Sequence, residues 1–317
     1  MRPSILPLLL LVALASCGDA PPAAPARDPY APDVVATTPS GPPVEVTFTE
    51  AAGDVFRTTG TLRYRRVVTG KAGPGLSPSE FVLEGTVDLR ARTESGDAGK
   101  LTVVVEGRLE TVELAAGTGG RRRDPRVDPL TLRFERDAKG RAVHRSIRLT
   151  APAAIHEALE VLQAAFTEPL RFPSRQVRVG QWFPPMDVLD LDQAMRRPLF
   201  FLFVRRAQMG QPAGAPIEGR VWIEAREAFG GTDVLRTRVA VTHAFEGDTD
   251  VPKPTKDNVA VGYRAAVEGT VRTAVAGGWA RTFDMTRRRR VSYRAADLDY
   301  AVEFEGRATL ETVREAP

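Results

Sequence analysis

Residues 84–92 read Glu-Gly-Thr-Val-Asp-Leu-Arg-Ala-Arg, and this stretch decides the fold class. Val87 and Leu89 alternate here with Thr86, Asp88 and Arg90. Successive residues of a β-strand point to opposite faces, so the alternation predicts a strand with one face in a core and the other in water.

The same period of two recurs through the rest of the chain. It is clear in three further runs: Val44, Val46 and Phe48; Leu101, Val103 and Val105; and Leu130, Leu132 and Phe134. Short polar or glycine-bearing breaks separate such runs, at residues 95–99, 137–140, 230–233 and 277–278. Breaks of this length are typical of hairpin loops, and strands joined by hairpins are antiparallel. We therefore expect a mainly β fold of long antiparallel hairpins.

An internal duplication is predicted at a spacing of 134 residues. The stretch 84–92 aligns with residues 218–226, which places Val87 over Val221 and Leu89 over Ile223. On the return strands, the alignment places Leu101 over Leu235, Val103 over Thr237 and Val105 over Val239. The alternative is coincidence, since short amphipathic hairpins resemble one another. We expect two similar β-rich halves, residues 44–166 and 167–317, forming a curved or half-barrel-like sheet.

Helices are expected in only two places. Ile155, Leu159, Leu162 and Phe166 recur at three- and four-residue steps, which predicts one principal amphipathic helix from Pro152 to Phe166, between the two halves. A second, short helix is predicted from Val188 to Arg197, ending before Pro198. Between them, Val177, Val179 and Trp182 indicate a strand-like segment or a wrapped loop.

Cys17 is the only cysteine in the chain, and it closes the run Leu14-Ala15-Ser16-Cys17. Arg2 and an apolar stretch from Ile5 to Ala15 precede it, which is the layout of a signal peptide and too short for a transmembrane helix. This run resembles the lipobox of bacterial lipoproteins. The alternatives are an ordinary secretory signal cut after Ala15 and a buried free cysteine.

The resemblance implies that residues 1–16 are a signal peptide and that Cys17 carries a diacylglycerol and an acyl chain such as palmitate. Residues 17–43 would then be a tether, because eight prolines among many alanines favour extended conformations over a packed core. Fully extended, it would reach about 80 Å. Gly18, where an aspartate would favour the inner membrane, favours the outer membrane of the cell envelope, facing the periplasm.

The charge and the lysine content of the chain bear on whether nucleic acid is a partner. The chain has 44 basic and 40 acidic residues, and removing Arg2 with the signal leaves a net charge near +3. Only five of the basic residues are lysine, a bias that a GC-rich genome explains better than nucleic-acid binding does. The absence of a second cysteine means that the exported domain must hold together without an internal disulfide. We expect no nucleic-acid partner.

No catalytic constellation is recognisable. The three histidines, His144, His156 and His243, lack the spacing of metal ligands, and there is no Gly-x-Ser-x-Gly motif. Asp187, Asp190 and Asp192 cluster, but not with the spacing of a calcium loop, and we interpret them as solvated acids near a helix start. We therefore predict no enzyme activity, no cofactor and no metal.

Three segments are candidates for contact with a ligand or partner. Arg121, Arg122 and Arg123 lie in a glycine-rich loop. Arg287, Arg288, Arg289 and Arg290 would contact anionic lipid or an acidic partner, or else form a solvated, polar edge strand. Phe200, Phe201 and Phe203 lie in the apolar run 199–204, which predicts a strand buried on both faces, or alternatively an exposed aromatic lip.

Two functions are compatible with these patterns. The first is a non-catalytic binding or assembly lipoprotein, held to the membrane through Cys17, with an apolar ligand or an envelope protein as its partner. The alternative is an envelope hydrolase that acts on glycan or lipid through dispersed carboxylates. The strand-rich pattern with one helix favours the first, because lipoprotein carriers build a curved antiparallel sheet around an apolar concavity.

Overall fold

A computed structural model describes the chain over residues 28–31, 35, 37–47, 49, 51–71, 79–95, 101–115, 121–122, 127–136, 142–148, 162, 166, 170, 172, 174–188, 217–246, 260–294 and 299–315. This part of the chain is mainly β, and all the pairings between its named strands are antiparallel, which confirms the predicted fold class at that level. No helix in these residues has the length and hydropathy needed to cross a bilayer.

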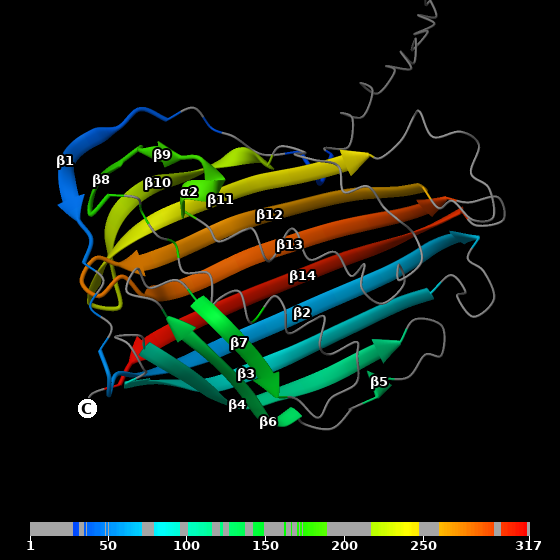
Figure 1. The fold of residues 1–317 in the computed structure, drawn as a ribbon, viewed down its shortest axis with the longest axis horizontal. Coiled ribbons are helices and arrows are strands. Elements are labelled where there is room, and N and C mark those ends of the chain that lie inside the picture. Colours follow the sequence, from blue (N-terminus) through cyan, green and yellow to red (C-terminus); the bar gives the residue numbers. More distant parts are fainter. Residues whose placement is uncertain are drawn as a thin grey trace, which may run out of the picture.

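One large sheet of 12 strands dominates the structure (Figure 1). Its first meander consists of β2 (Val55–Lys71), β3 (Ser79–Ser95), β4 (Leu101–Ala115), β6 (Val127–Arg136) and β7 (Ala142–Arg148), with the short β5 (Arg121–Arg122) beside β4. Its second meander consists of β10 (Ile217–Phe229), β11 (Thr232–Glu246), β12 (Ala260–Ala274), β13 (Ala280–Arg294) and β14 (Asp299–Arg314), with β9 (Trp182–Phe183) at its edge.

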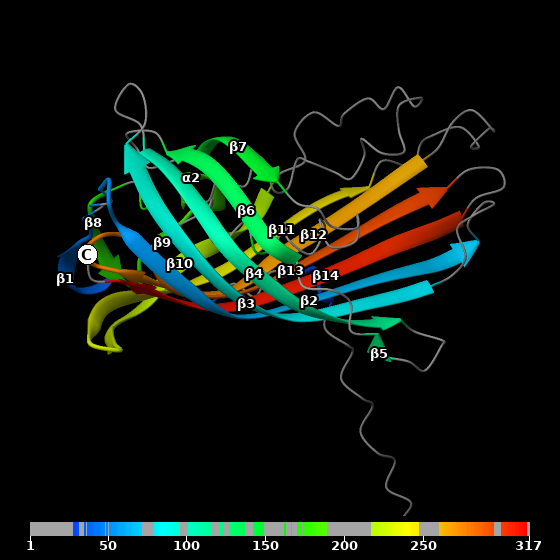
Figure 2. The ribbon, with the colours of Figure 1, turned by 90° about the horizontal axis from the view of Figure 1, so that it is seen from below.

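The two meanders join where the last strand pairs with the first. Strand β14 pairs with β2 from Asp299 opposite Lys71 to Arg314 opposite Phe56. The sheet order is therefore β7-β6-β4-β3-β2-β14-β13-β12-β11-β10-β9, and β7 and β9 are its edges in the described part of the chain. Seen from below, the sheet is a curved trough, with β6 and β7 rising at one side (Figure 2).

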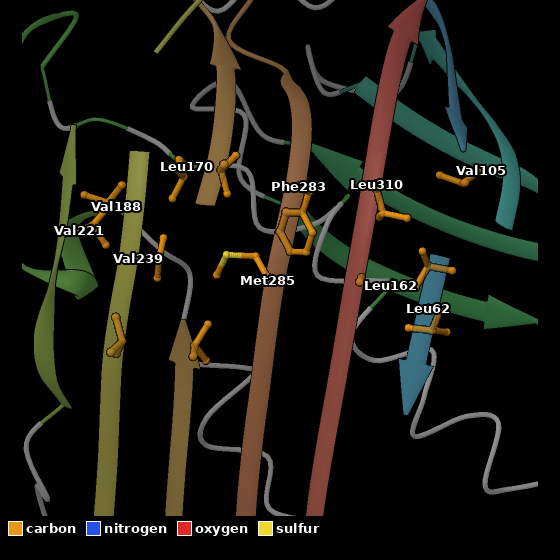
Figure 3. Close-up of a cluster of buried hydrophobic side chains, with 14 of the residues drawn as sticks. Leu62, Val105, Leu162, Leu170, Val188, Val221, Val239, Phe283, Met285 and Leu310 are labelled. Atoms are coloured by element: carbon orange, nitrogen blue, oxygen red, sulfur yellow. The ribbon is translucent and has the colours of Figure 1, made fainter. Parts of the chain in front are cut away.

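The core lies on the inner, concave face of this trough. Side chains of both meanders that share this face belong to one buried cluster, and residues of the segment 162–188 pack against them. Figure 3 shows the arrangement, with Leu162, Leu170 and Val188 close to Val239, Phe283 and Leu310 of the sheet. This packing explains why the strands alternate: each contributes its apolar positions to a single shared core.

The expected helix from Pro152 to Phe166 lies outside the described residues except at Leu162 and Phe166. Both of these are helical, and Leu162 is buried in the core. The helix as a whole therefore stays a prediction. The second expected helix is described only up to Val188, where the four-residue helix α2 (Pro185–Val188) ends. The strand-like segment around Val177 is confirmed as β8 (Gln176–Val179) and β9.

The structure corrects the expected extent of the tether. Strand β1 (Ser40–Glu45) begins before Pro43 and pairs with β8 in a separate two-stranded sheet. The pairing is irregular between Ser40 and Val44, because Pro42 and Pro43 have no N–H to donate. Asp28 and Tyr30 also contact the large sheet. Composition alone predicted an extended segment because it carries no information on these contacts.

The burial predicted from the internal alignment is confirmed, the strand register predicted from it is wrong, and the duplication itself stays a prediction. Val87, Leu89, Val221 and Ile223 are all buried on the inner face. However, Val221 pairs with Val239, whereas Val87 pairs with Leu109 and not with Val105. The physical reason is the turn. Only Gly230 and Gly231 separate β10 from β11, and a bulge follows Ile223, whereas five residues separate β3 from β4.

Candidate functional site

The two faces of the sheet differ sharply in chemistry. The outer face carries cross-strand ion pairs, including Arg57–Asp88 at 3.0 Å, Arg63–Glu84 at 3.4 Å and Arg307–Asp284 at 3.0 Å. The Arg57 guanidinium holds the pKa of Asp88 below its ordinary value, and Arg226 does the same for Asp233. Charges of both signs thus alternate over a surface suited to water, while the apolar side chains face inward.

The predicted cluster of four arginines lies on β13, and alternation divides it between the two faces. Arg288 is 2.5 Å from Glu268 and 2.9 Å from Glu305, and Arg290 is 3.2 Å from Glu303, all on the outer face. Arg287 and Arg289 share the inner face with Phe283, Met285 and Val291, which are buried. The interpretation as a polar edge strand is wrong, because β13 pairs with both β12 and β14.

Arg289 lies in a row of inner-face side chains that crosses the sheet. Phe304 of β14 is directly opposite both Arg289 of β13 and Arg66 of β2. Across β12, the row continues through Ala265 to His243 of β11. Directly opposite residues of antiparallel strands project from the same face. We call the inner-face set Arg66, Arg287, Arg289 and His243 the basic end of the trough.

Aromatic rings hold the guanidinium groups of the basic end. The Arg289 guanidinium carbon lies 5.7 Å from the centre of the Phe304 ring, and that of Arg66 lies 5.8 Å from the centre of the Phe81 ring. Tyr64 contacts both rings, at 6.2 Å from Phe81 and 6.5 Å from Phe304. Cation–π contacts of this kind restrict the positions of these two charged groups on the inner face.

Two tyrosines lie further along the same face. The Tyr293 and Tyr300 rings stack with centres 4.8 Å apart. Burial, and secondarily the charge of Tyr300, raises the pKa of Tyr293 to about 12, and burial also raises the pKa of Tyr300. Both phenols are therefore protonated near neutral pH and can donate a hydrogen bond.

A shallow depression of about 470 Å³ lies on the outer face, near the joint of the two meanders. It is lined by Gly107 and by three basic and three acidic side chains: Arg57, Arg90, Arg108, Asp88, Glu106 and Glu315. The opposite charges pair with one another, as in Arg90–Glu315 at 2.7 Å. This mutual neutralisation leaves it without a net charge for recognising an ion.

Several predicted site residues lie outside the described residues, namely Cys17, Phe200, Phe201, Phe203, His156, Asp190 and Asp192. Arg121 and Arg122 form β5 beside β4, and His144 lies in β7. Among the described residues, no group of three or more His, Cys, Asp or Glu side chains is placed to hold a metal ion.

Sequence reasoning missed Arg66. A signal was present, since Arg66 interrupts the apolar series Leu62, Tyr64 and Val68 on one face of β2. The Nε of Arg66 is buried and has no hydrogen-bond partner among the described residues. What no local pattern could reveal is that β2 lies next to β14 and thus brings Arg66 close to Arg289.

Comparisons with known proteins identify no family. No family model matches the chain, and no curated protein does. A solved structure titled for lipid–protein interactions in lipovitellin is similar over 84% of this chain at 10% identity, with a TM-score of 0.40, and the match spans only 26% of that chain. A DUF1329 family protein from Desulfovibrio piger matches over 83% of this chain and 86% of its own, at 8% identity and a TM-score of 0.15. Neither score is high enough to support an argument about this fold or its function.

Proposed function

We propose that the chain is a lipid-anchored protein of the bacterial cell envelope that binds an apolar or amphipathic ligand on the concave face of its sheet, without catalysing a reaction. The Leu14–Cys17 run supports the anchor, and Gly18 supports an outer-membrane location facing the periplasm. The observation that carries the binding role is the sidedness of the sheet: ion pairs cover the outer face and apolar side chains continue along the inner face.

This sidedness suits a ligand that avoids water. Because neighbouring strands lie about 4.8 Å apart, the strands from β3 to β11 in the sheet order together span about 24 Å of inner face. The described side chains that pack over that face from the segment 162–188 gather near Phe283 and Leu310. Further along the strands, the inner face continues through Val302, Tyr293 and Tyr300, which are only partly buried.

The experiment is native mass spectrometry of the protein extracted from its own envelope in polymer-bounded membrane discs. We expect a co-purifying apolar molecule that is lost from Val302→Trp, because the larger side chain fills the inner face of β14 beside Val291. The matched control is Glu303→Trp, the next residue on the same strand, which points to the outer face. Loss of the ligand from both variants, or no ligand on the wild type, would contradict the proposal.

A further inference from the structure

We propose that the outer face of the sheet, at its β9 edge, docks an acidic segment of a partner protein through Trp182, Arg220 and Arg238. We call these three residues the tryptophan–arginine patch. The patch lies on the opposite face of the sheet from the concave surface that is proposed to bind a ligand, and its role does not depend on that ligand.

The three residues of the patch come together at one edge of the large sheet. Trp182 of β9 lies directly opposite Trp222 of β10, which in turn lies directly opposite Arg238 of β11. Arg220 comes two residues before Trp222 on β10 and therefore projects from the same face. Val221, between these two, is buried in the core on the inner face, so the patch is on the outer face. Figure 1 shows β9 beside β10, at the edge of the described sheet.

Trp182 provides the exposed apolar surface of the patch. Its exposed fraction is 44%, and among the other described large apolar side chains only Val35 and Val313 are exposed. The guanidinium carbon of Arg220 lies 4.6 Å from the centre of the Trp182 ring, within the range of a cation–π contact. The contact places an aromatic ring and a cation side by side on one surface. Tryptophan and arginine are two of the residues that most often dominate the binding energy of protein interfaces.

The two arginines of the patch differ from most arginines on the outer face because they lack a carboxylate partner. Arg63, Arg288 and Arg307 each form an ion pair across strands. Neither Arg220 nor Arg238 forms an ion pair with any residue that the structure describes. The two are diagonal neighbours on β10 and β11, about 7–8 Å apart. Two adjacent cations without counter-charges give the surface a positive potential, which attracts an acidic partner.

The carboxylates beside the patch do not cancel its charge. Glu224 of β10 is 3.2 Å from Arg236 and is neutralised by it. Glu218, two residues before Arg220, is exposed and forms no ion pair within the described part of the chain. Arg178, which is exposed near the end of β8, adds a further cation just before β9. The surface around the patch therefore keeps a net positive charge.

The combination of a ring and two cations determines the kind of partner. A partner that uses both features must present acidic groups next to an apolar group, as an acidic protein segment does. A free inorganic anion gains nothing from the Trp182 ring, because it has no apolar surface to remove from water.

The test uses the mature chain with Cys17→Ala and calorimetric titration with a synthetic peptide in which Glu and Leu alternate. The neutral comparison is the peptide in which Gln replaces each Glu. The test variant is Arg220→Gln with Arg238→Gln. The matched control is Arg63→Gln with Arg65→Gln, which removes the same charge from the outer face of β2, where both arginines pair with carboxylates. Heparin serves as a polyanion without a peptide chain.

We expect the wild type and the β2 control to bind the acidic peptide about tenfold more tightly than the neutral one. The test variant should lose this preference. Glu218→Gln should bind the acidic peptide several-fold more tightly than the wild type, because it removes a carboxylate that repels the peptide. Trp182→Ala should bind it several-fold more weakly with an unchanged Tm, since the ring is exposed.

Equal affinity of the wild type for the two peptides, or a preference that survives in the test variant, would overturn the docking of an acidic segment. Unchanged affinity of Trp182→Ala would overturn the role of the ring. Heparin binding that equals peptide binding at the same charge and does not depend on Trp182 would show a general polyanion surface and overturn the protein partner.

Discussion

Asp28 and Arg264 are separated by 236 residues in the chain and form an ion pair of 2.6 Å on the outer face of the sheet. The Arg264 guanidinium carbon also lies 5.2 Å from the centre of the Tyr30 ring, and the Tyr30 N–H donates to the Asp28 carboxylate at 2.9 Å. Burial, the largest cause, raises the pKa of Tyr30 to about 12. The segment around residue 30 is thus docked on β12, and only about 35 Å of extended chain can separate Asp28 from Cys17.

Removing this docking should expose the segment to proteases. We expect trypsin to cut after Arg27 several-fold faster in Arg264→Gln than in the wild type, because the ion pair and the ring contact both depend on the guanidinium. Arg226→Gln, which breaks a comparable exposed pair with Asp233, is the control. Equal rates of cleavage at Arg27 in all three proteins, measured by mass spectrometry, would contradict the docking.

The proposed lipid anchor at Cys17 can be tested through the maturation of the protein. We expect Cys17→Ser to block both lipidation and signal cleavage, because the acyl chain attaches through the cysteine sulfur and the processing of lipoproteins depends on it. Palmitate labelling in the native host measures lipidation, and the electrophoretic mobility of the precursor measures signal cleavage. Equal labelling of the variant and the wild type would rule out the proposed anchor.

Substitution of Gly269 should cause a large loss of stability. Its φ is 155°, and a Cβ atom there would overlap the carbonyl oxygen of Asp284 and lie 2.8 Å from the Cα of Met285. Gly269→Ala should lower the free energy of unfolding by about 3 kcal/mol, because central strands of the sheet must separate. Gly231→Ala, with φ of 76° but open space around it, should cost only about 1 kcal/mol. Urea denaturation of both variants makes the comparison.

Tyr293 predicts how stability changes in alkaline solution. Its pKa is raised from 10 to about 12, mainly by burial, so the folded state favours the neutral phenol. That contribution is complete below pH 10 and is lost as the pH rises toward 12. Tyr293→Phe has no proton to lose there. Between pH 10 and 12, the wild type should therefore lose roughly 1 kcal/mol more of its free energy of unfolding than Tyr293→Phe does. Parallel urea-denaturation curves would show that the phenol is not buried.

Alternation in the sequence was a reliable guide to which face a residue occupies. It correctly assigned Val87, Leu89, Val221 and Ile223 to a core, because the period of a strand is set by its own backbone. The same rule, applied along residues 287–290, divides the arginines between two faces as the structure does. The predicted edge strand failed because alternation does not specify the neighbours of a strand.

Register and long-range neighbours could not be read from the sequence. The return strands of the two hairpins differ by four residues in pairing because a two-glycine turn at Gly230 and Gly231 and a bulge replace a longer loop. Arg66 and Arg289 lie opposite the same residue, Phe304, only because β14 pairs with both β2 and β13. That arrangement depends on a pairing between opposite ends of the chain, which no local pattern encodes.

The pairing of β14 with β2 makes the fold dependent on the completion of its own synthesis. Strand β2 pairs with β3 early, but its other edge stays without a neighbour until β14 has been made. The loop closed by the pairing of β2 with β14 includes almost the whole domain. Contacts between such distant segments slow folding, so the two meanders would spend time with their neighbouring edges exposed. A chain that ends before Asp299 would lack the strand that joins the meanders, and truncation near the C-terminus should therefore be as damaging as a change in the core.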